Sequence, residues 1–450
     1  MPITSLQTGT RIRLHLDSLA AGGEAVGRHE GVAVFAMWGC PGDEAEIEIT
    51  EVADRFARAV VREVITPSPD RVTAPCPHFG YCGGCQLQHI AYSAQLRHKT
   101  QIVRDAISRI GGLSDVEIAE TWGMDDPWRY RNRVEYHADL DADANLHLGF
   151  ARIHSHDVLA LQECALQHPV SEQARVAMLD LVPRLAQGGE ERAALLEVES
   201  LVSFHSGEAI VTLVCDGRPP FLRALAEALK RTVPAVVGVT TARARGRLAT
   251  HRSPGTSLLG KSHLSEHLGE HAYRISPDSF FQTNPRQAAR MLELVKEWAA
   301  VGKRDGVVDL YSGVGTFLLP LAQRAHHAAA VEENEAALAD ARANLREWRL
   351  DSVNLYEGKV ERVLPRLAQR GWRTDLIVMD PPRKGCGPVV CASAAKLNPR
   401  RIILISCHPA TLARDLKCLA DRGYRATRIQ PIDMFPQTWH VEAVAVCERA

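Results

Sequence analysis

The 450-residue sequence first informs by what it lacks. No apolar run approaches the ~20 residues that a membrane-spanning helix needs, which argues against an integral membrane protein. The opening residues, MPITSLQTGTRIRLHLD, contain no apolar signal-peptide core, so we expect a cytoplasmic protein. There is no internal repeat and no low-complexity segment. The net charge of -1 is close to zero, so the chain as a whole shows no bias toward nucleic acid.

A regular disulfide framework is also missing. The eleven cysteines are odd in number and irregular in spacing. In a cytoplasmic protein this pattern indicates free thiols or metal ligands rather than disulfide bonds.

The length predicts two or three domains. Residues 1–65 alternate in short strand-like pieces separated by glycine turns, which predicts a small antiparallel β-barrel. Residues 66–265 mix strands and helices and form a predicted central domain, including a helix at 91–111 that we expect to pack on the catalytic domain. Residues 266–450 alternate continuous apolar runs with helical stretches, which is typical of a doubly wound parallel sheet. The fold class is therefore multidomain α/β.

Charge is unevenly distributed along the chain. Residues 1–65 hold ten acids against six bases, whereas residues 228–265 hold seven bases and no acid. The seven bases are Lys230, Arg231, Arg243, Arg245, Arg247, Arg252 and Lys261. The sequence WRYRNR, Trp128 to Arg133, is a second basic cluster that contains aromatic rings. Either segment alone is typical of a solvated face, but together they favour an RNA-binding surface.

The sequence VVDLYSGVGTF contains the first chemical motif. A predicted strand ends at Asp309 and turns through Gly313 and Gly315 into a helix, and Glu332 ends the next predicted strand. A glycine turn followed by a distal acid is typical of nucleotide binding, with the acid on a ribose. Leu318 replaces the third glycine of a nicotinamide-dinucleotide motif, so the pattern favours S-adenosylmethionine, while a nicotinamide cofactor remains the alternative.

Two strands later, LIVMDPPRKG places Asp380 at the end of a buried strand, before two prolines. Ligands in such sheets bind at the carboxyl ends of the strands, so Asp380 is a candidate site residue. A similar acid-Pro-Pro loop in amino-methyltransferases holds a nitrogen nucleophile and would imply methylation on nitrogen. The cysteine at the end of the next strand favours methylation on carbon instead.

The sequence IILISCHPATLARDL places Cys407 where a buried strand would end. Carbon 5 of a pyrimidine is a poor nucleophile, but a thiolate that adds to carbon 6 activates it. A general base must then remove the carbon 5 proton, and Glu442 in MFPQTWHVEAVAV is the candidate. We assign no catalytic role to the neighbouring His440. Cys407 and Glu442 together predict methylation on carbon.

A second constellation lies in CPHFGYCGGCQLQH. Cys76, Cys82 and Cys85 follow a C-x5-C-x2-C spacing, and Cys164 is the candidate fourth ligand. Four thiolates suit either zinc or an iron–sulfur cluster.

These motifs together resemble the RumA/TrmA family of RNA uracil-5 methyltransferases in its iron–sulfur branch, over nearly the whole chain. The resemblance implies a TRAM barrel at 1–65, a central domain with a [4Fe-4S] cluster, and a Rossmann-like class I methyltransferase domain. It implies Cys407 as nucleophile and Glu442 as base. The residues that it implies at the S-adenosylmethionine site are Gln282, Tyr311, Thr316, Glu332 and Asp380, and the implied cluster ligands are Cys76, Cys82, Cys85 and Cys164.

Two residues depart from the family pattern. His408 follows the nucleophile where asparagine is usual, and Thr316 stands where some members have asparagine. The resemblance is greater to 23S rRNA enzymes, so we expect a monomer that methylates a 23S rRNA uridine flipped out of its stack. A tRNA T-loop methyltransferase is the alternative substrate class. A nicotinamide-dependent iron–sulfur oxidoreductase is the alternative reaction class, although it leaves Cys407 and Glu442 unexplained.

Overall fold

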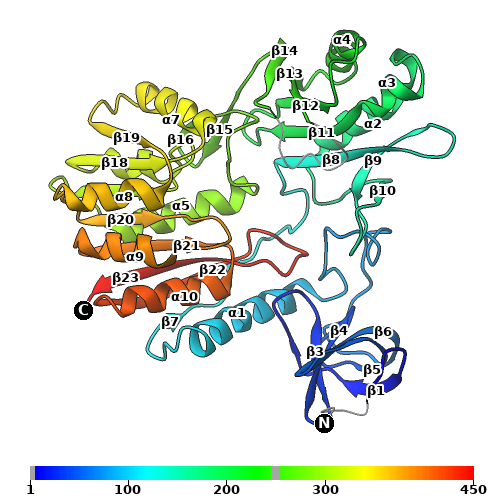
Figure 1. The fold of residues 1–450 in the computed structure, drawn as a ribbon, viewed down its shortest axis with the longest axis horizontal. Helices are drawn as coiled ribbons and strands as arrows, with labels where there is room; N and C mark the ends of the chain where they lie inside the picture. The colour runs from blue at the N-terminus through cyan, green and yellow to red at the C-terminus, as the bar shows by residue number, and fades with distance from the viewer. Residues whose placement is uncertain (1–5, 245–252) are drawn as a thin grey trace.

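The computed structural model describes residues 6–244 and 253–450. Within these ranges the strands form sheets of six, seven, two and eight strands. Figure 1 shows the six-stranded sheet near the N-terminus, the seven-stranded sheet in the middle of the chain and the eight-stranded sheet at the C-terminal end as three neighbouring bodies. No helix in the described ranges is long and apolar enough to cross a membrane.

The N-terminal body is a six-stranded sheet in the order β1-β5-β6-β4-β3-β2. Its strands are β1 (Arg11–His15), β2 (Ser18–Leu19), β3 (Ala25–His29), β4 (Val32–Met37), β5 (Glu44–Val52) and β6 (Phe56–Thr66). Strict alternation in β4 and the first part of β5 buries one side chain in two, and the buried set forms a separate small core. The prediction of an antiparallel barrel was wrong at one pair, because β4 and β6 run parallel.

The central body is a seven-stranded sheet in the order β10-β9-β8-β11-β12-β13-β14. Its strands are β8 (Arg133–Leu140), β9 (Leu146–Ala151), β10 (Val158–Ala160), β11 (Leu195–Val202), β12 (Ala209–Cys215), β13 (Val236–Arg243) and β14 (Thr256–Gly260). Its helices are α2 (Pro169–Leu185), α3 (Gly189–Ala193) and α4 (Leu222–Thr232). Apolar residues of α2 and α4 pack on the sheet in one core, and α4 connects the parallel pair β12 and β13.

The C-terminal body contains an eight-stranded sheet in the order β19-β18-β17-β20-β21-β23-β22-β7. Its strands are β7 (Glu117–Ile118), β17 (Gly306–Leu310), β18 (His327–Glu332), β19 (Val353–Glu357), β20 (Leu376–Met379), β21 (Arg401–Ser406), β22 (Tyr424–Ile432) and β23 (Glu442–Arg449). The first five strands in this order are parallel, and β23 is antiparallel to both of its neighbours. A two-stranded hairpin, β15 (Leu264–Leu268) and β16 (His271–Ile275), precedes this sheet.

Helices cover both faces of the eight-stranded sheet (Figure 1). One face carries α5 (Pro285–Ala299), α6 (Leu318–Ala322) and α7 (Glu335–Glu347), and the other carries α1 (Tyr92–Arg109), α8 (Val360–Gln369), α9 (Gly387–Lys396) and α10 (Pro409–Ala420). Successive residues of the central strands enter opposite cores, since strand side chains alternate. This burial on both faces explains the continuous apolar runs in the sequence.

Two elements from the middle of the chain pack with the C-terminal sheet. Helix α1 corresponds to the helix predicted at 91–111, and its buried residues Val103, Ala106 and Ile107 lie in the same core as α10. Strand β7 extends the sheet by pairing in parallel with β22. The segment before the central sheet therefore wraps around the C-terminal body.

Candidate active site

The candidate site lies where the strand order reverses. Strand β17 is followed in the chain by β18 on one side, while β20 and β21 lie on its other side. Open α/β sheets bind ligands at such a switch point, outside the carboxyl ends of the strands. The loops after β17, β18, β20 and β21 all leave the sheet at this edge.

The turn after β17 has the backbone geometry of a ligand-binding turn. Gly313 and Gly315 have φ of 54° and 93°, a region that suits glycine, and Tyr311 adopts φ of 62° in spite of its side chain. The amide of Gly313 donates to Oε2 of Glu332 at 2.8 Å. The other oxygen of Glu332 accepts from the amides of Glu333 and Asn334. Glu332 thus fixes the turn and the end of β18 together.

Buried polar atoms lie next to this turn without partners. The two carboxylate oxygens of Asp309, the hydroxyl of Tyr311 and the hydroxyl of Ser312 have no hydrogen-bond partner among the described residues. Burial and the nearby charge of Asp380 raise the pKa of Asp309 well above its ordinary value. Because buried polar groups are nearly always hydrogen-bonded, the oxygens of Asp309 and Ser312 mark the turn as a candidate place for a polar ligand such as S-adenosylmethionine. The hydroxyl of Tyr311 lies on the other face of the sheet, toward Cys386, Glu361 and Asp415.

The structure brings together Cys407 and Glu442 at the same edge. Cys407 directly follows β21, and Glu442 begins β23, which pairs antiparallel with β21. Ser406 lies opposite Ala443 in this pairing, so the next residue of one strand and the preceding residue of the other meet at the rim. Cys407 is half-buried and Glu442 is buried.

Burial raises the pKa of both groups. Burial first, then the carboxylates of Glu442 and Asp380, raise the pKa of the Cys407 thiol to about 12, while Arg383 opposes them. Burial and Asp380 likewise raise the pKa of Glu442 well above its ordinary value. Strongly perturbed groups in one place are typical of catalytic sites.

Asp380 connects the two halves of the site. It follows β20, and its Oδ2 accepts a hydrogen bond from Nε2 of Gln282 at 3.1 Å. Burial raises the pKa of Asp380 to about 7, and the Gln282 hydrogen bond opposes this shift. Thr316 is buried, and its backbone carbonyl accepts from the hydroxyl of Tyr273. Gln282, Tyr311, Thr316, Glu332 and Asp380 therefore surround one edge of the sheet, and their ligand contacts stay a prediction.

The two histidines near the thiol have different positions. His408 caps α10, because its Nδ1 accepts from the amide of Thr411 at 3.4 Å. His440 lies 3.3 Å from the guanidinium of Arg383, and burial lowers the pKa of His440 to about 4. His440 is therefore neutral near pH 7 and suits a hydrogen-bonding role more than a charged one.

Sequence reasoning missed three features of the site. Phe280, two residues before Gln282, is 63% exposed, which is unusual for a large aromatic residue. Arg383, inside the quoted Pro-Pro loop, is the cation whose charge acts on Cys407. Asp433 forms a fully buried ion pair with Lys99. An arginine after Asp-Pro-Pro and an aspartate between apolar residues were the available signals.

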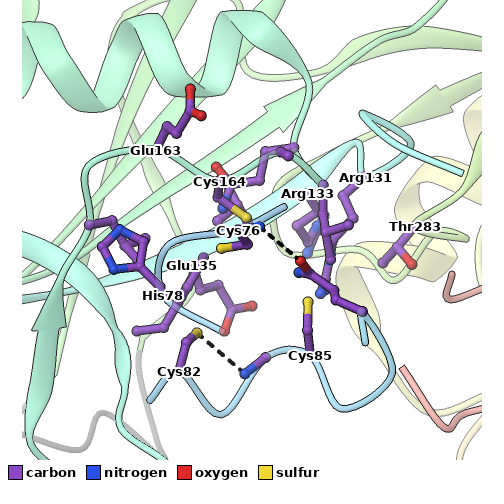
Figure 2. Close-up of a pocket in the computed structure, with 18 of the residues that line it drawn as sticks. Cys76, His78, Cys82, Cys85, Arg131, Arg133, Glu135, Glu163, Cys164 and Thr283 are labelled. Carbon is purple, nitrogen blue, oxygen red and sulfur yellow. Dashed lines mark hydrogen bonds between the residues drawn. The ribbon is translucent and has the colours of Figure 1, made fainter. Parts of the chain in front are cut away.

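The four predicted metal ligands lie around another space. Cys76, Cys82, Cys85 and Cys164 line a cavity of about 420 Å³, and Figure 2 shows their sulfur atoms around a common space. Burial raises the pKa of Cys85 to about 12 and that of Cys164 to about 11. No group of three or more His, Cys, Asp or Glu side chains within the described ranges is arranged to hold a metal ion. The iron–sulfur prediction is therefore not confirmed, although four thiols around one cavity fit the donor chemistry of a cluster.

The predicted basic surface is only partly present. Tyr130 is fully buried and donates to the carbonyl of Pro436, so it is not available to stack on a base. Trp128 is half-buried and Arg129 is exposed. Lys261 pairs with Glu208 at 2.7 Å. Arg245, Arg247 and Arg252 lie outside the described residues.

The sheet topology, the glycine turn at its switch point and the preceding barrel define the class of the protein as a methyltransferase with an added N-terminal domain. The family model tRNA (Uracil-5-)-methyltransferase matches residues 91–450, and the TRAM domain model matches residues 6–61. The chain belongs to the RNA uracil-5 methyltransferase family, whose members depend on S-adenosylmethionine. This assignment does not favour the nicotinamide-dependent alternative.

Individual relatives agree with this assignment. An uncharacterized RNA methyltransferase of Halalkalibacterium halodurans is 35% identical, with 97% of this chain and 96% of the relative covered. An uncharacterized RNA methyltransferase of Caldanaerobacter subterraneus is 32% identical, with coverage of 99% and 100%. Among solved structures, the Pyrococcus abyssi tRNA (uracil-54, C5)-methyltransferase in complex with S-adenosyl-L-homocysteine matches with a TM-score of 0.75 and 26% identity. That match covers 97% of this chain and 100% of the archaeal enzyme.

Proposed function

We propose that this protein methylates carbon 5 of a specific RNA uridine, with S-adenosylmethionine as methyl donor and Cys407 as covalent catalyst. The observation that carries the proposal is the meeting of Cys407 and Glu442 at the rim of a methyltransferase sheet. A thiol and a carboxylate are the two groups that this reaction requires of the protein.

Bound S-adenosylmethionine supplies an electrophilic methyl group. Tyr311, Thr316 and Glu332 would hold it beside the glycine turn, where the unpartnered oxygens of Asp309 and Ser312 also lie. Gln282 and Asp380 are hydrogen-bonded to each other between this turn and Cys407. We infer that this pair orients the uracil ring, because an amide and a carboxyl can match the edge of a pyrimidine.

Cys407 begins the reaction on the RNA. The Cys407 thiol first loses its proton to solvent, and the thiolate then adds to carbon 6 of uracil. The electron pair moves to carbon 5, which takes the methyl group from the sulfonium of the donor as the methyl–sulfur bond breaks. Glu442 removes the remaining proton from carbon 5, and the sulfur leaves carbon 6 as the double bond re-forms. Both groups react in their ionised forms, and burial raises the pKa of each, so we expect the rate to rise with pH.

The target uridine must leave its stack to reach Cys407. Phe280 lies in the same loop as Gln282, and its exposed ring also lines the cavity of the four cysteines. We infer that this ring stacks on a base of the bound RNA. Arg129, Arg231 and Arg243 are exposed cations of the central body that would contact RNA phosphates.

We propose a uridine of 23S rRNA as the target, in a cytoplasmic monomeric enzyme, from the resemblance of the motifs. A tRNA T-loop uridine is the second candidate, because the P. abyssi enzyme that matches over its full length acts on tRNA uracil-54. Mapping of 5-methyluridine in rRNA and tRNA from a deletion strain separates the two. Loss of a modification in rRNA alone supports the first candidate, and loss in tRNA alone supports the second. Unchanged 5-methyluridine in both would contradict the proposed activity.

We also propose that Cys76, Cys82, Cys85 and Cys164 hold a [4Fe-4S] cluster with a structural role. Methyl transfer exchanges no electrons, and none of these cysteines belongs to the sheet edge that carries Cys407. Protein purified without oxygen should be brown and contain about four irons per chain. Stoichiometric zinc without iron would contradict this. Cys82→Ser and Cys164→Ser should lower the unfolding temperature clearly, while the Kd for S-adenosylmethionine should change little.

A further inference from the structure

The segment that connects β22 to β23 contains Asp433 to Gln437 and leads to the candidate base. Its two ends are adjacent, because Ile432, the last residue of β22, pairs with Glu442, the first residue of β23. Asp433 follows Ile432 directly in the chain, so it is the neighbour of the residue that pairs with Glu442. The start of this segment and the candidate base are therefore neighbours across the β22–β23 pair.

Each backbone carbonyl from Asp433 to Gln437 accepts a hydrogen bond from outside these five residues. Five consecutive carbonyls accept hydrogen bonds from donors of other parts of the chain, which is far more than a surface loop needs. The donors are Gln287 Nε2 to Asp433 (3.1 Å), Asn284 Nδ2 to Met434 (3.2 Å), Lys99 Nζ to Phe435 (3.2 Å), Tyr130 Oη to Pro436 (3.1 Å), and the amides of Gln86 and Leu87 to Gln437 (3.1 and 3.0 Å). The segment also contains Gln437 in the left-handed region, with φ of 71°. Its conformation is thus fixed by its surroundings.

Lys99 on α1 is the charged member of this set of donors. Its side chain is fully buried, and its ammonium lies 2.6 Å from Oδ1 of Asp433. The other oxygen of Asp433 accepts from the hydroxyl of Tyr92, also on α1, at 2.8 Å. Lys99 thus holds both the first side chain and the third carbonyl of the segment.

A buried ion pair contributes little net stability. Removing two charges from water costs about as much as their attraction offsets, and apolar replacements are often as stable. What such a pair provides is a fixed geometry, because a buried ammonium and carboxylate tolerate few arrangements. The pair spans 334 residues of sequence and fastens α1 to the end of β22.

We propose that Lys99 is a positioning residue that holds the segment Asp433–Gln437 so that Glu442 can reach the proton on carbon 5. The inference rests on the proposed function. Cys407 follows β21, Tyr311 and Thr316 follow β17, Glu332 ends β18 and Asp380 follows β20, so none of these residues is carried by this segment. Gln282 also lies outside it, in the loop before α5, although Asn284 and Gln287 of the same region donate to the segment. Loss of Lys99 should therefore slow proton removal more than it slows addition or methyl transfer.

The test uses Lys99→Met, which keeps the length of the side chain and removes its charge. With S-adenosylmethionine and substrate RNA, this variant should accumulate a covalent methylated enzyme–RNA species on a denaturing gel. We expect release of methylated RNA to slow roughly ten- to a hundredfold, as for a small misplacement of a catalytic group. Binding of S-adenosylmethionine and formation of the 5-fluorouridine adduct should stay near wild type.

A second variant separates positioning from folding. Lys99→Met/Asp433→Asn leaves no unpaired charge, and the amide oxygen introduced by the second substitution can still accept from Tyr92, so this variant should unfold near the wild-type temperature. It should still accumulate the covalent species. Amide hydrogen exchange should quicken in residues 434–441 and stay unchanged in α10. Arg104→Met is the matched control, because Arg104 on the same helix pairs with Glu120 at the surface.

The outcomes are distinct. A wild-type protein that forms no 5-fluorouridine adduct would overturn the proposed function and this inference with it. A wild type that forms the adduct, together with a double variant that releases product at the wild-type rate, would overturn only the inference. Equal slowing of adduct formation and product release in the double variant would also overturn it, since that result marks a general structural role.

Discussion

Two sets of carboxylates in this protein have opposite surroundings. On the barrel, alternate residues of β5 are acidic and face cations of the neighbouring strands β1 and β6. The pairs are Arg13–Glu44, His15–Glu44, Arg11–Glu46, Arg11–Glu48 and Arg62–Glu48, with nitrogen–oxygen distances from 3.0 to 3.4 Å. At the rim of the C-terminal sheet, Asp309 and Glu442 are buried and Asp380 is half-buried, and no cation pairs with any of the three among the described residues.

The pKa values follow this difference. The hydrogen bond from Arg62 lowers the pKa of Glu48, whereas burial raises the pKa of Glu442 well above its ordinary value. Exposed ion pairs contribute little to folding stability in water. A buried carboxylate with no cation beside it destabilises the folded state when it is ionised. A protein retains such groups where chemistry needs them.

The largest effect should come from the thiol. Cys407→Ala should lose methyl transfer by at least ~10³-fold, because no other described group is placed to add to carbon 6. It should retain S-adenosylmethionine binding and form no adduct with 5-fluorouridine RNA, measured by methyl incorporation and denaturing gels. Cys418→Ala is the matched control, since Cys418 is a half-buried cysteine on α10 away from the rim. Substantial turnover by Cys407→Ala would contradict the mechanism.

The second effect concerns the unmatched carboxylate itself. Glu442→Gln should add and methylate but fail to remove the proton, so a methylated covalent enzyme–RNA species should accumulate. Turnover should fall by about 10²- to 10⁴-fold, which is the usual contribution of a general base. Glu448→Gln on the same strand is the control, because Glu448 pairs with Arg401 at 2.6 Å instead of facing the site. Normal turnover without accumulation would assign the base to another residue.

The fold was largely predictable where burial is regular. The apolar runs of β17, β18, β20 and β21 predicted a doubly wound sheet, because strands buried on both faces must be continuously apolar. The helix pattern predicted α1 to within a few residues. The parallel pairing of β4 and β6 was not predictable, since alternation gives the buried face of a strand and not its partner.

The site was predictable where its residues end strands. Cys407 and Asp380 follow apolar runs, so the edge of the sheet places both at the rim. The Lys99–Asp433 pair was not predictable, because nothing local links two residues 334 positions apart. The burial of Tyr130 was missed for the same reason, since its partner is the carbonyl of Pro436 in a distant loop. Tertiary contacts decide the burial of Lys99, Asp433 and Tyr130, and for Tyr130 the surrounding sequence WRYRNR has the pattern of an exposed basic segment.

The smallest effects should appear in stability and should differ in sign between the two sets. A group whose folded pKa is raised holds its proton longer in the folded state, so its contribution is present at low pH and lost as pH rises. Glu442 therefore destabilises the folded state above the ordinary carboxyl pKa of about 4.3. Glu442→Gln should raise the unfolding temperature near pH 8 by roughly a few degrees. The gain should shrink toward pH 4.

Glu48 has a lowered pKa, so its contribution is present above the same pKa and lost in acid. Since the Arg62–Glu48 pair lies at the surface and is screened by salt, Glu48→Gln should lower the unfolding temperature by about one degree or less. Thermal unfolding of both variants across this pH range, followed by fluorescence, gives the comparison. A destabilised Glu442→Gln at pH 8 would show that the buried carboxylate has a stabilising partner.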